Sequence, residues 1–374
     1  MGSNSYFFWK SNDKLCRFTF IRFFLLMIFT FTLCQFIGSA QSPKKITVGN
    51  IEADPGEKIS GILEVTKGID QGTIIPVSII NGKKPGPVLT LIAGMHGTEY
   101  VPIITLQRNL SLLDPNEISG AIIMVHIANL ASFKDRRIYY NPIDRKNLNR
   151  QFPGNKEGTI TERIADIITN EIIDQSDYLL DIHGGELNEN ILHYVSFEYD
   201  CINEALCDKT KFLAHAFGGY YIQPEPFNIV PDSVKLTFCH LTSIRRGVPA
   251  IFVEAGGRGN TDNNSIIYVE QGINNIMKAL KMIKGEVKVP NPVVYLSIEE
   301  SVTSHFDGIF YPLVECGQSV SKGSLLGYLT DFFGNRIEEF HSPIDGIVIM
   351  HYDTPVVNKD EDVYFISEPK FSLN

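Results

Sequence analysis

The chain has 374 residues, of which 44% are hydrophobic and 20% are charged. This is the balance of a globular protein, and the length allows one large domain and a smaller one. The formal net charge of -10 at pH 7 argues against a nucleic-acid-binding protein, so we expect no nucleic-acid partner. The charge does not exclude small anionic substrates, which respond to the local charge of a site.

Residues 1–40 predict a secretory signal peptide. An apolar run at residues 23–37 is followed by the small residues 38–40 and preceded by four basic residues, Lys10, Lys14, Arg17 and Arg22. Because a membrane-spanning helix needs roughly 20 apolar residues, this shorter run favours a cleavable signal over an uncleaved anchor. We therefore expect a secreted or periplasmic protein that begins at Gln41 and keeps no stable membrane anchor.

Two of the cysteines, Cys16 and Cys34, belong to the predicted signal, and four follow it: Cys201, Cys207, Cys239 and Cys316. None of the four has the C-x-x-C spacing of a zinc or redox site. An oxidising compartment permits a disulfide between Cys201 and either Cys207 or Cys239. Buried free thiols are the alternative.

The middle of the chain alternates between strand-like and helical patterns. Short strands are expected within residues 45–80, and further strands at 88–93, 121–127, 178–182, 191–197 and 250–255. Amphipathic periodicity predicts helices at 162–175 and 265–283. Strands that alternate with helices predict an α/β fold in which helices cover both faces of a sheet.

After residues 287–293 the pattern changes to short β-like runs separated by glycines, which predicts a small all-β module. The expected organisation is therefore a signal peptide at 1–40, an α/β domain with a β lead-in at 41–288, and a C-terminal β-domain at 289–374.

Two predicted strands end in side chains that can bind a metal. The stretch GMHGTEY, residues 94–100, carries His96 and Glu99, and YLLDIHGG, residues 178–185, carries His183. Catalytic zinc sites use three protein ligands, often two histidines and one glutamate. His96, Glu99 and His183 fit that pattern. Asp181 is either an outer-shell group of the site or a cap of the strand end.

A third strand end, in PAIFVEAGG at residues 249–257, carries Glu254. A carboxylate among apolar residues costs free energy unless it has a partner or a role. Beside a metal site, Glu254 can take a proton from water and pass it to a leaving amine. An ion pair with Arg258 is the alternative.

The long stretch 133–154 has no clean periodicity, and loops of this length in compact domains are often functional. It contains four arginines, Arg136, Arg137, Arg145 and Arg150. Guanidinium groups bind carboxylates through two hydrogen bonds and can stabilise an oxyanion. A solvated basic loop is the alternative.

In this order, GMHGTE, NPIDRKNLNRQFPG, DIHGG and FVEAGG resemble the succinylglutamate desuccinylase/aspartoacylase family, relatives of the zinc carboxypeptidases. The resemblance runs from about residue 85 to the C-terminus. It implies a zinc-carboxypeptidase-like mixed sheet with helices on both faces. It also implies one zinc ion per chain, bound by His96, Glu99 and His183, and Glu254 as general base and acid.

The resemblance also implies residues that bind the substrate. Asn149 and Arg150 match the family's pair that grips a substrate carboxylate. An arginine upstream polarises the scissile carbonyl; we favour Arg137 for this role and place Arg136 among the substrate-binding residues. Many members have an aspartate where Asn147 stands, and the best-known members are cytosolic.

The C-terminal module, residues 308–348 above all, resembles the lipoyl/biotinyl-like β-domain of this family. Carrier domains present a lysine at a hairpin tip, but the turn within 342–350 has Asp345 and Gly346 and no lysine. We therefore predict a fixed cover over the active site.

These patterns predict an exported zinc-dependent hydrolase. Its target is an amide bond, or alternatively an ester, in a small carboxylate-bearing substrate such as an N-acyl amino acid. The alternatives are a zinc carboxypeptidase that acts on peptides or cell-wall peptides, and a non-catalytic binding protein on the same fold. The oligomeric state is left open.

Overall fold

The structure is a computed structural model that describes residue 1 and residues 43–201, 203–227 and 238–372. The chain divides into two units, Met1–Ser42 and Pro43–Asn374, and the elements below belong to the second. The predicted signal peptide and its two cysteines lie outside the described residues, apart from Met1. No helix in the described part is long and apolar enough to cross a membrane.

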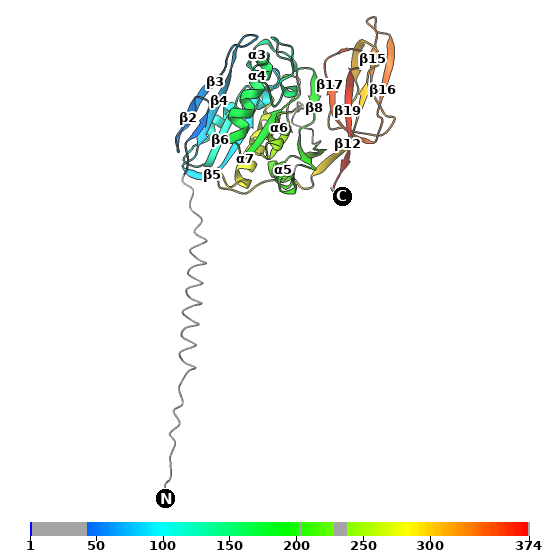
Figure 1. Ribbon diagram of the computed structural model, residues 1–374. Coiled ribbons are helices and arrows are strands. Elements are labelled where there is room, and N and C mark those ends of the chain that lie inside the picture. The colour runs from blue at the N-terminus through cyan, green and yellow to red at the C-terminus, as the bar shows by residue number, and fades with distance from the viewer. Residues whose placement is uncertain (2–42, 202, 228–237, 373–374) are drawn as a thin grey trace. The chain divides into compact units, whose positions relative to one another are not determined.

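A large mixed sheet runs through Pro43–Asn374 (Figure 1). Its strands lie in the order β14-β17-β19-β12-β10-β9-β11-β7-β5-β6-β4-β3, and β8 pairs with β17. The strand bounds are β3 Lys58–Val65, β4 Thr73–Asn81, β5 Lys84–Ile92, β6 Ser119–Val125, β7 Tyr178–His183, β8 Glu189–Ile191, β9 Tyr194–Tyr199, β10 Tyr221–Pro226, β11 Ala250–Glu254, β12 Val294–Thr303, β14 Ser319–Val320, β17 Gly346–Tyr352 and β19 Asp362–Lys370. Two short strands, β1 Ile46–Val48 and β2 Ile51–Ala53, form a separate hairpin.

Helices cover both faces of this sheet. Strand side chains alternate between faces, so Leu180 packs in one core and its neighbour Leu179 in the other. The first core includes residues of α2 (Tyr100–Leu112), α5 (Glu204–Phe217) and α7 (Asn263–Ala279). The second includes residues of α4 (Ile160–Ile167) and α6 (Cys239–Arg245). This arrangement confirms the predicted α/β class.

The two helices predicted from periodicity are present with different ends. The segment expected at 162–175 begins at Ile160 as α4 and continues as a π-helical turn, Ile168–Ile172, and a 3₁₀ turn, Ile173–Gln175. The helix expected at 265–283 is α7, which ends at Ala279. Short helices also form at α3, Leu130–Asp135, and at the 3₁₀ turn Leu148–Arg150.

The C-terminal region is all-β, as predicted. A second sheet, in the order β16-β15-β13-β18, consists of Arg336–His341, Leu325–Thr330, Gly308–Pro312 and Val356–Val357. This region has its own core, which includes Phe310, Phe340 and Tyr364. Its strands β12, β19, β17 and β14 nevertheless continue the large sheet, so the region is joined to the α/β part by backbone hydrogen bonds.

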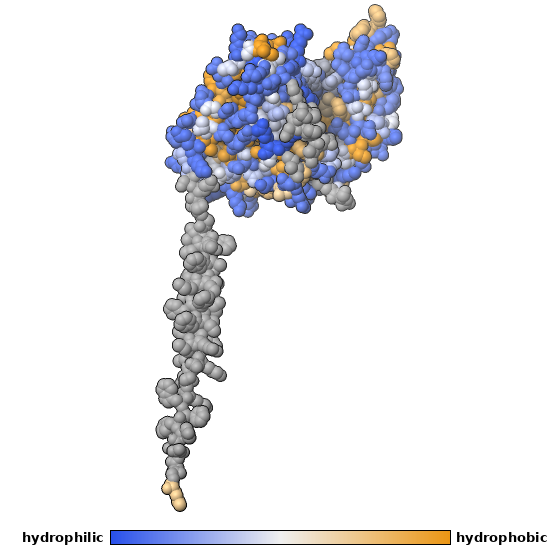
Figure 2. All heavy atoms as spheres, viewed as in Figure 1, coloured by the Kyte–Doolittle hydropathy of each residue, from blue (hydrophilic) through white to orange (hydrophobic). Residues whose placement is uncertain are grey.

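Figure 2 shows a mainly hydrophilic surface with scattered apolar patches. One patch lies at the tip of the β15–β16 hairpin, where Phe332 and Phe333 are 74% and 92% exposed.

Candidate metal and catalytic site

Three neighbouring parallel strands bring the candidate residues to one edge of the sheet. β7 pairs in parallel with both β5 and β11, so the carboxyl ends of all three strands lie together. In the register of β7 and β11, Glu254 lies opposite His183. Because directly paired residues project from the same face of a sheet, both side chains reach one pocket, which they line together with His96 and Glu99.

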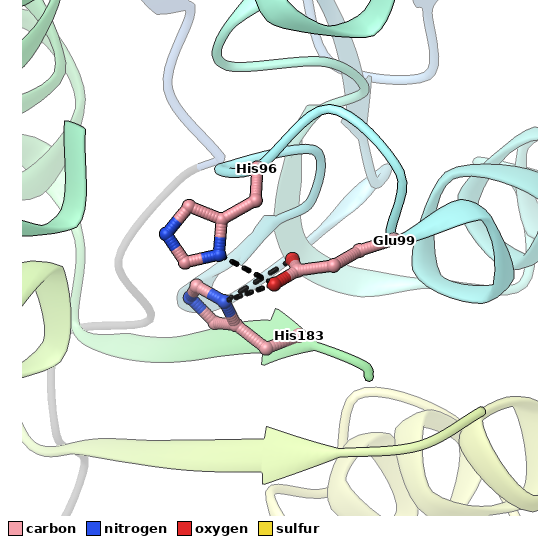
Figure 3. Close-up of side chains that lie close together, drawn as sticks. All are labelled: His96, Glu99 and His183. Atoms are coloured by element: carbon pink, nitrogen blue, oxygen red, sulfur yellow. Dashed lines mark hydrogen bonds and ion pairs between the residues drawn. The ribbon is translucent and has the colours of Figure 1, made fainter. Parts of the chain in front are cut away.

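His96, Glu99 and His183 form the cluster that the sequence predicts (Figure 3). Their nearest ligand atoms all lie within 4.8 Å of one another. The Nδ1 atom of His96 is 2.6 Å from Glu99 Oε1, and the Nδ1 atom of His183 is 3.2 Å from the same carboxylate. All three residues are buried.

The other ring nitrogens are held by outer groups. His96 Nε2 lies 3.0 Å from Asn147 Oδ1, and His183 Nε2 lies 3.2 Å from Asp181 Oδ1. When each Nε2–H donates to these oxygens, each Nδ1 is left as an acceptor that faces Glu99. In this protonation state, the three converging acceptors repel one another unless a cation lies among them. The residues therefore fit a metal ion with two histidine ligands and one glutamate ligand.

The electrostatics favour positive charge at this point. Burial alone would raise the pKa of Glu99, but the charges of His183 and His96 lower it to about 2. Burial lowers the pKa of His183, and the carboxylates of Glu99 and Asp181 more than reverse this, so its pKa lies well above the usual value. Asp181 is fully buried, and its Oδ2 also accepts from the backbone N–H of His240 at 3.3 Å.

Glu254 lies in the same pocket, and its Oε2 is buried without a hydrogen-bond partner in the described structure. Burial raises its pKa well above the usual value; His183 opposes this, and Glu99 adds to it. The alternative partner, Arg258, is engaged elsewhere, with Glu315 at 3.1 Å and Asp353 at 2.9 Å. Glu254 is therefore a carboxyl group that can hold or release a proton beside the metal cluster.

The pocket around these residues has a volume of about 230 Å³. It is lined by the candidate metal ligands His96, Glu99 and His183 and by Glu254. The C-terminal β-region supplies part of its wall through Glu299 of β12, Ile349 and Met350 of β17, and Phe365 of β19. Small-molecule sites are typically concave and mostly apolar with a few fixed polar groups. This pocket differs in that charged and polar side chains make up much of its lining, which suits a small charged ligand.

Asn149 and Arg150 also line the pocket. Asn147 accepts from the Asn149 backbone N–H at 2.8 Å and so begins the 3₁₀ turn that carries both residues. The Arg150 guanidinium lies 4.5 Å from the ring centroid of Phe238 and donates to the Asn149 carbonyl at 2.9 Å. Burial lowers the pKa of Arg150. These contacts orient the guanidinium and leave other N–H groups for a ligand.

The structure does not bring Arg136 and Arg137 to the described walls of this pocket. Both line a neighbouring cavity together with Arg145. Arg136 ends α3 in the left-handed conformation, with φ 52°, and Arg137 Nε then pairs with Asp135 at 2.6 Å. The chain next turns inward, and Tyr139 lines the pocket that contains His96, Glu99 and His183.

Several contributors to the site were not predicted from the sequence. Tyr139 donates its backbone N–H to Glu186 at 2.8 Å and its hydroxyl to Glu189. Thr98 also donates its hydroxyl to Glu186. Glu186 and Glu189 follow the DIHGG motif within six residues of His183, which is the sequence signal that could have identified them.

The cysteines adopt one of the predicted pairings. Cys201 and Cys207 form a disulfide with a Cα–Cα separation of 5.4 Å. Cys239 is a buried free thiol and Cys316 a half-buried one.

Comparison with known proteins now identifies the family. Residues 85–280 match the model of the succinylglutamate desuccinylase/aspartoacylase catalytic domain. The chain belongs to this family. It is therefore a hydrolase of the deacylase type, and the resemblance inferred from the four motifs is confirmed.

Members of the succinylglutamate desuccinylase/aspartoacylase family align over nearly their full lengths. An N-alpha-acetyl-L-2,4-diaminobutyric acid deacetylase from Halomonas elongata is 28% identical over 89% of this chain and 97% of its own length. A succinylglutamate desuccinylase structure from Silicibacter sp. TM1040 matches with a TM-score of 0.77 and 22% identity, over 88% of this chain and 98% of that one. The product-bound ectoine utilization protein EutE (DoeB) from Ruegeria pomeroyi matches with a TM-score of 0.76 and 24% identity, over 87% of this chain and 99% of that chain. These structures share the fold.

Proposed function

We propose that this protein is a zinc-dependent deacylase that hydrolyses the amide bond of a small N-acyl amino acid. One observation carries the proposal. Two histidines and a carboxylate converge in a pocket that also contains the Arg150 guanidinium and Glu254, whose Oε2 is buried without a hydrogen-bond partner among the described residues.

Zinc bound by His96, Glu99 and His183 would supply a Lewis acid and lower the pKa of a water molecule at the site. Glu254 takes a proton from the attacking water and later delivers it to the leaving nitrogen. The C–N bond breaks, and a carboxylic acid and an amine are released. The buried position of Glu254, which raises its pKa, suits a group that must both accept and donate the proton.

Arg150 and Asn149 bind the carboxylate of the amino acid. A guanidinium makes two parallel hydrogen bonds to a carboxylate, and stacking on Phe238 limits the orientations that Arg150 can adopt. Because the protein as a whole is acidic, the positive charge in this pocket is local. It selects substrates with a free carboxylate over their amides and esters.

Two residues, Arg137 and Tyr139, are candidates for polarising the scissile carbonyl. The family pattern favours Arg137, which in this structure pairs with Asp135. Tyr139 already lines the pocket, and its O–H, which donates to Glu189 in this structure, would turn to the carbonyl oxygen of a bound substrate. Burial and then Glu189 raise the pKa of this phenol, which keeps it protonated. We assign the role to Tyr139 and compare the two residues experimentally below.

An N-acyl amino acid is favoured over a peptide by the size of the pocket. A volume of about 230 Å³, walled in part by β17 and β19, suits a small molecule better than an extended chain. The name of the Halomonas elongata relative, a deacetylase of an acetylated amino acid, supports the same choice.

The test is a panel of N-acetyl amino acids and short peptides, assayed with the zinc-loaded protein. We expect release of acetate from the acyl amino acids and none from the Glu254→Gln variant. Cleavage of peptides alone would favour a carboxypeptidase. Ligand binding without hydrolysis of any substrate would favour a binding protein.

We also propose that the protein is exported and that residues 1–40 are removed. The apolar run at 23–37 supports this, and the Cys201–Cys207 disulfide is compatible with an oxidising compartment. The intact mass of the exported protein should correspond to a chain that begins at Gln41, without an added biotin or lipoyl group. A chain that begins at Met1 would contradict export by this route.

A further inference from the structure

A further charged group lines the same pocket as the candidate metal ligands. Glu299 of β12 lines the pocket and is exposed to it. The side-chain amide of Gln223 on β10 donates to Glu299 Oε2 at 3.1 Å and to Glu225 Oε1 at 2.6 Å. One amide nitrogen therefore holds two carboxylates next to each other at the edge of the catalytic pocket.

The neighbouring strand adds a third carboxylate, Glu198, whose Oε1 pairs with His240 at 2.8 Å. In the parallel pairing of β9 and β10, Glu198 lies directly opposite Glu225, so both project from the same face. Burial, Glu299 and Glu198, in this order, raise the pKa of Glu225 to about 7. No lysine or arginine of the described residues lies within ion-pair distance of Glu225 or Glu299. Like charges placed together in this way are stabilised by a cation.

Two buried acceptors in the same place also lack partners. Gln223 is 8% exposed, and its Oε1 accepts no hydrogen bond in the described structure. Glu198 is 2% exposed; its Oε1 pairs with His240, whereas its Oε2 is unpartnered. Buried polar atoms usually have hydrogen-bond partners. These acceptors can take further hydrogen bonds, so they fit a ligand that has donors and no acceptor. An ammonium group, with three N–H donors, is such a ligand.

The pocket therefore carries opposite charges at separate positions. Arg150 supplies the positive group and Glu299 the negative one, and both line the cavity that contains Glu254 and the metal cluster. A substrate complementary to this pattern has a carboxylate, an amide and a protonated amine.

We propose that Glu299 and Glu225, held by Gln223, form a subsite for the ammonium group of the substrate's side chain. On this proposal, which rests on the proposed deacylase function, the substrates are N-acylated diamino acids. The substrate for which the Halomonas elongata relative is named has such an amine.

The test compares two substrates of similar shape, Nα-acetyl-L-2,4-diaminobutyrate and Nα-acetyl-L-norvaline, which has a methyl group in place of the ammonium. We expect kcat/KM to be about 10- to 100-fold higher for the diamino substrate, equivalent to one or two steps of about 1.4 kcal/mol. Glu299→Gln and Glu225→Gln should bring the ratio close to 1. The matched control is Glu300→Gln, the next residue on β12, which is exposed and does not line the pocket; it should keep the wild-type ratio.

A charge reversal distinguishes recognition from a structural role. Glu299→Lys should invert the preference in favour of Nα-acetyl-L-glutamate, an effect that loss of folding cannot produce. If the wild type hydrolyses both substrates equally well, the subsite is wrong while the deacylase function stands. If neither substrate is hydrolysed, the deacylase function is wrong, and calorimetry with the same two compounds decides on the subsite. Tighter binding of the diamino compound supports the subsite, and equal or absent binding overturns it.

Discussion

Asp181 fixes the orientation of His183. Its Oδ1 lies 3.2 Å from His183 Nε2, and when an N–H at Nε2 donates to this oxygen, Nδ1 faces Glu99 as an acceptor. Asn147 holds His96 in the same way, with its Oδ1 3.0 Å from His96 Nε2. Both candidate ligands are thus held by a second layer of polar groups, and such groups tune metal affinity nearly as strongly as the ligands themselves.

The first prediction concerns metal content. The mature protein should bind about one zinc ion per chain, and His96→Ala or His183→Ala should lose most of it, because two ligands hold zinc poorly. Asp181→Asn should weaken zinc affinity by about 10- to 100-fold. Zinc is measured by elemental analysis after dialysis against a chelator of known affinity. His341→Ala, a change at an exposed histidine of the C-terminal region, is the control. Full zinc content in both ligand variants would refute the assignment.

The second prediction separates the role of Glu254 from that of a ligand. Glu254→Gln preserves shape but cannot accept a proton, so kcat should fall by about 10²-fold or more while zinc content is unchanged. Parallel measurement of turnover and bound zinc checks both parts. Near-normal turnover would make Glu254 structural, and loss of zinc would make it a ligand.

The group of candidate metal ligands could be predicted from the sequence because its signal is local. β7 and β11 are apolar runs that end directly in His183 and Glu254. In a parallel sheet, the ends of such strands meet at one edge. The glycines that follow let the backbone approach closely: a Cβ at Gly184 would lie 2.3 Å from the Ala255 carbonyl oxygen.

The rest of the site depends on contacts that no local pattern encodes. After the left-handed end of α3 at Arg136, the chain brings Tyr139 into the pocket rather than Arg136 or Arg137. Glu299 reaches the pocket because β12 extends the large sheet, and its partner Gln223 is 76 residues away in the sequence. Helix α2 was not predicted either; it starts directly after Glu99, and its apolar face is defined by packing on the sheet.

The third prediction concerns Arg150. N-acyl amino acids should be cleaved faster than their amides or methyl esters, and Arg150→Ala should reduce this preference. A charge-assisted hydrogen bond is worth about 1.5–3 kcal/mol, so the loss in kcat/KM is about 10- to 100-fold. Arg150→Lys should keep little of the preference for the acid, because an ammonium cannot make the two parallel hydrogen bonds that a planar guanidinium makes to a carboxylate. Arg145→Ala, in the neighbouring cavity, is the control. A wild type without preference for the acid would refute the carboxylate contact.

The fourth prediction compares Tyr139 with Arg137. If the Tyr139 hydroxyl stabilises the oxyanion, Tyr139→Phe should lower kcat by about 10²-fold, as is usual when one such donor is removed. Arg137→Ala should then have a small effect, because in this structure the guanidinium faces the adjacent cavity. Steady-state kinetics with the best substrate decide between them. The opposite pattern would show that Arg137 moves into the metal pocket during turnover, as the family pattern implies.

The last prediction concerns the pH dependence of substrate choice. The pKa of Glu225 is raised to about 7, first by burial, then by Glu299 and Glu198, with Gln223 and His240 opposing. Glu225 is therefore mostly protonated at about pH 6 and mostly ionised at about pH 8, whereas the substrate's amine, with a pKa near 10, stays charged throughout. The subsite gains a negative charge as the pH rises through 7, so the preference for a cationic side chain should increase in this direction.

The quantity to measure is the ratio of kcat/KM for Nα-acetyl-L-2,4-diaminobutyrate and Nα-acetyl-L-norvaline at each pH. Groups that both substrates use equally, including Glu254 and the metal cluster, cancel in this ratio. It should rise several-fold between about pH 6 and pH 8 in the wild type and stay flat in Glu225→Gln, because glutamine does not titrate in this range. A ratio that rises equally in both proteins would assign the titration to another group and remove Glu225 from the subsite.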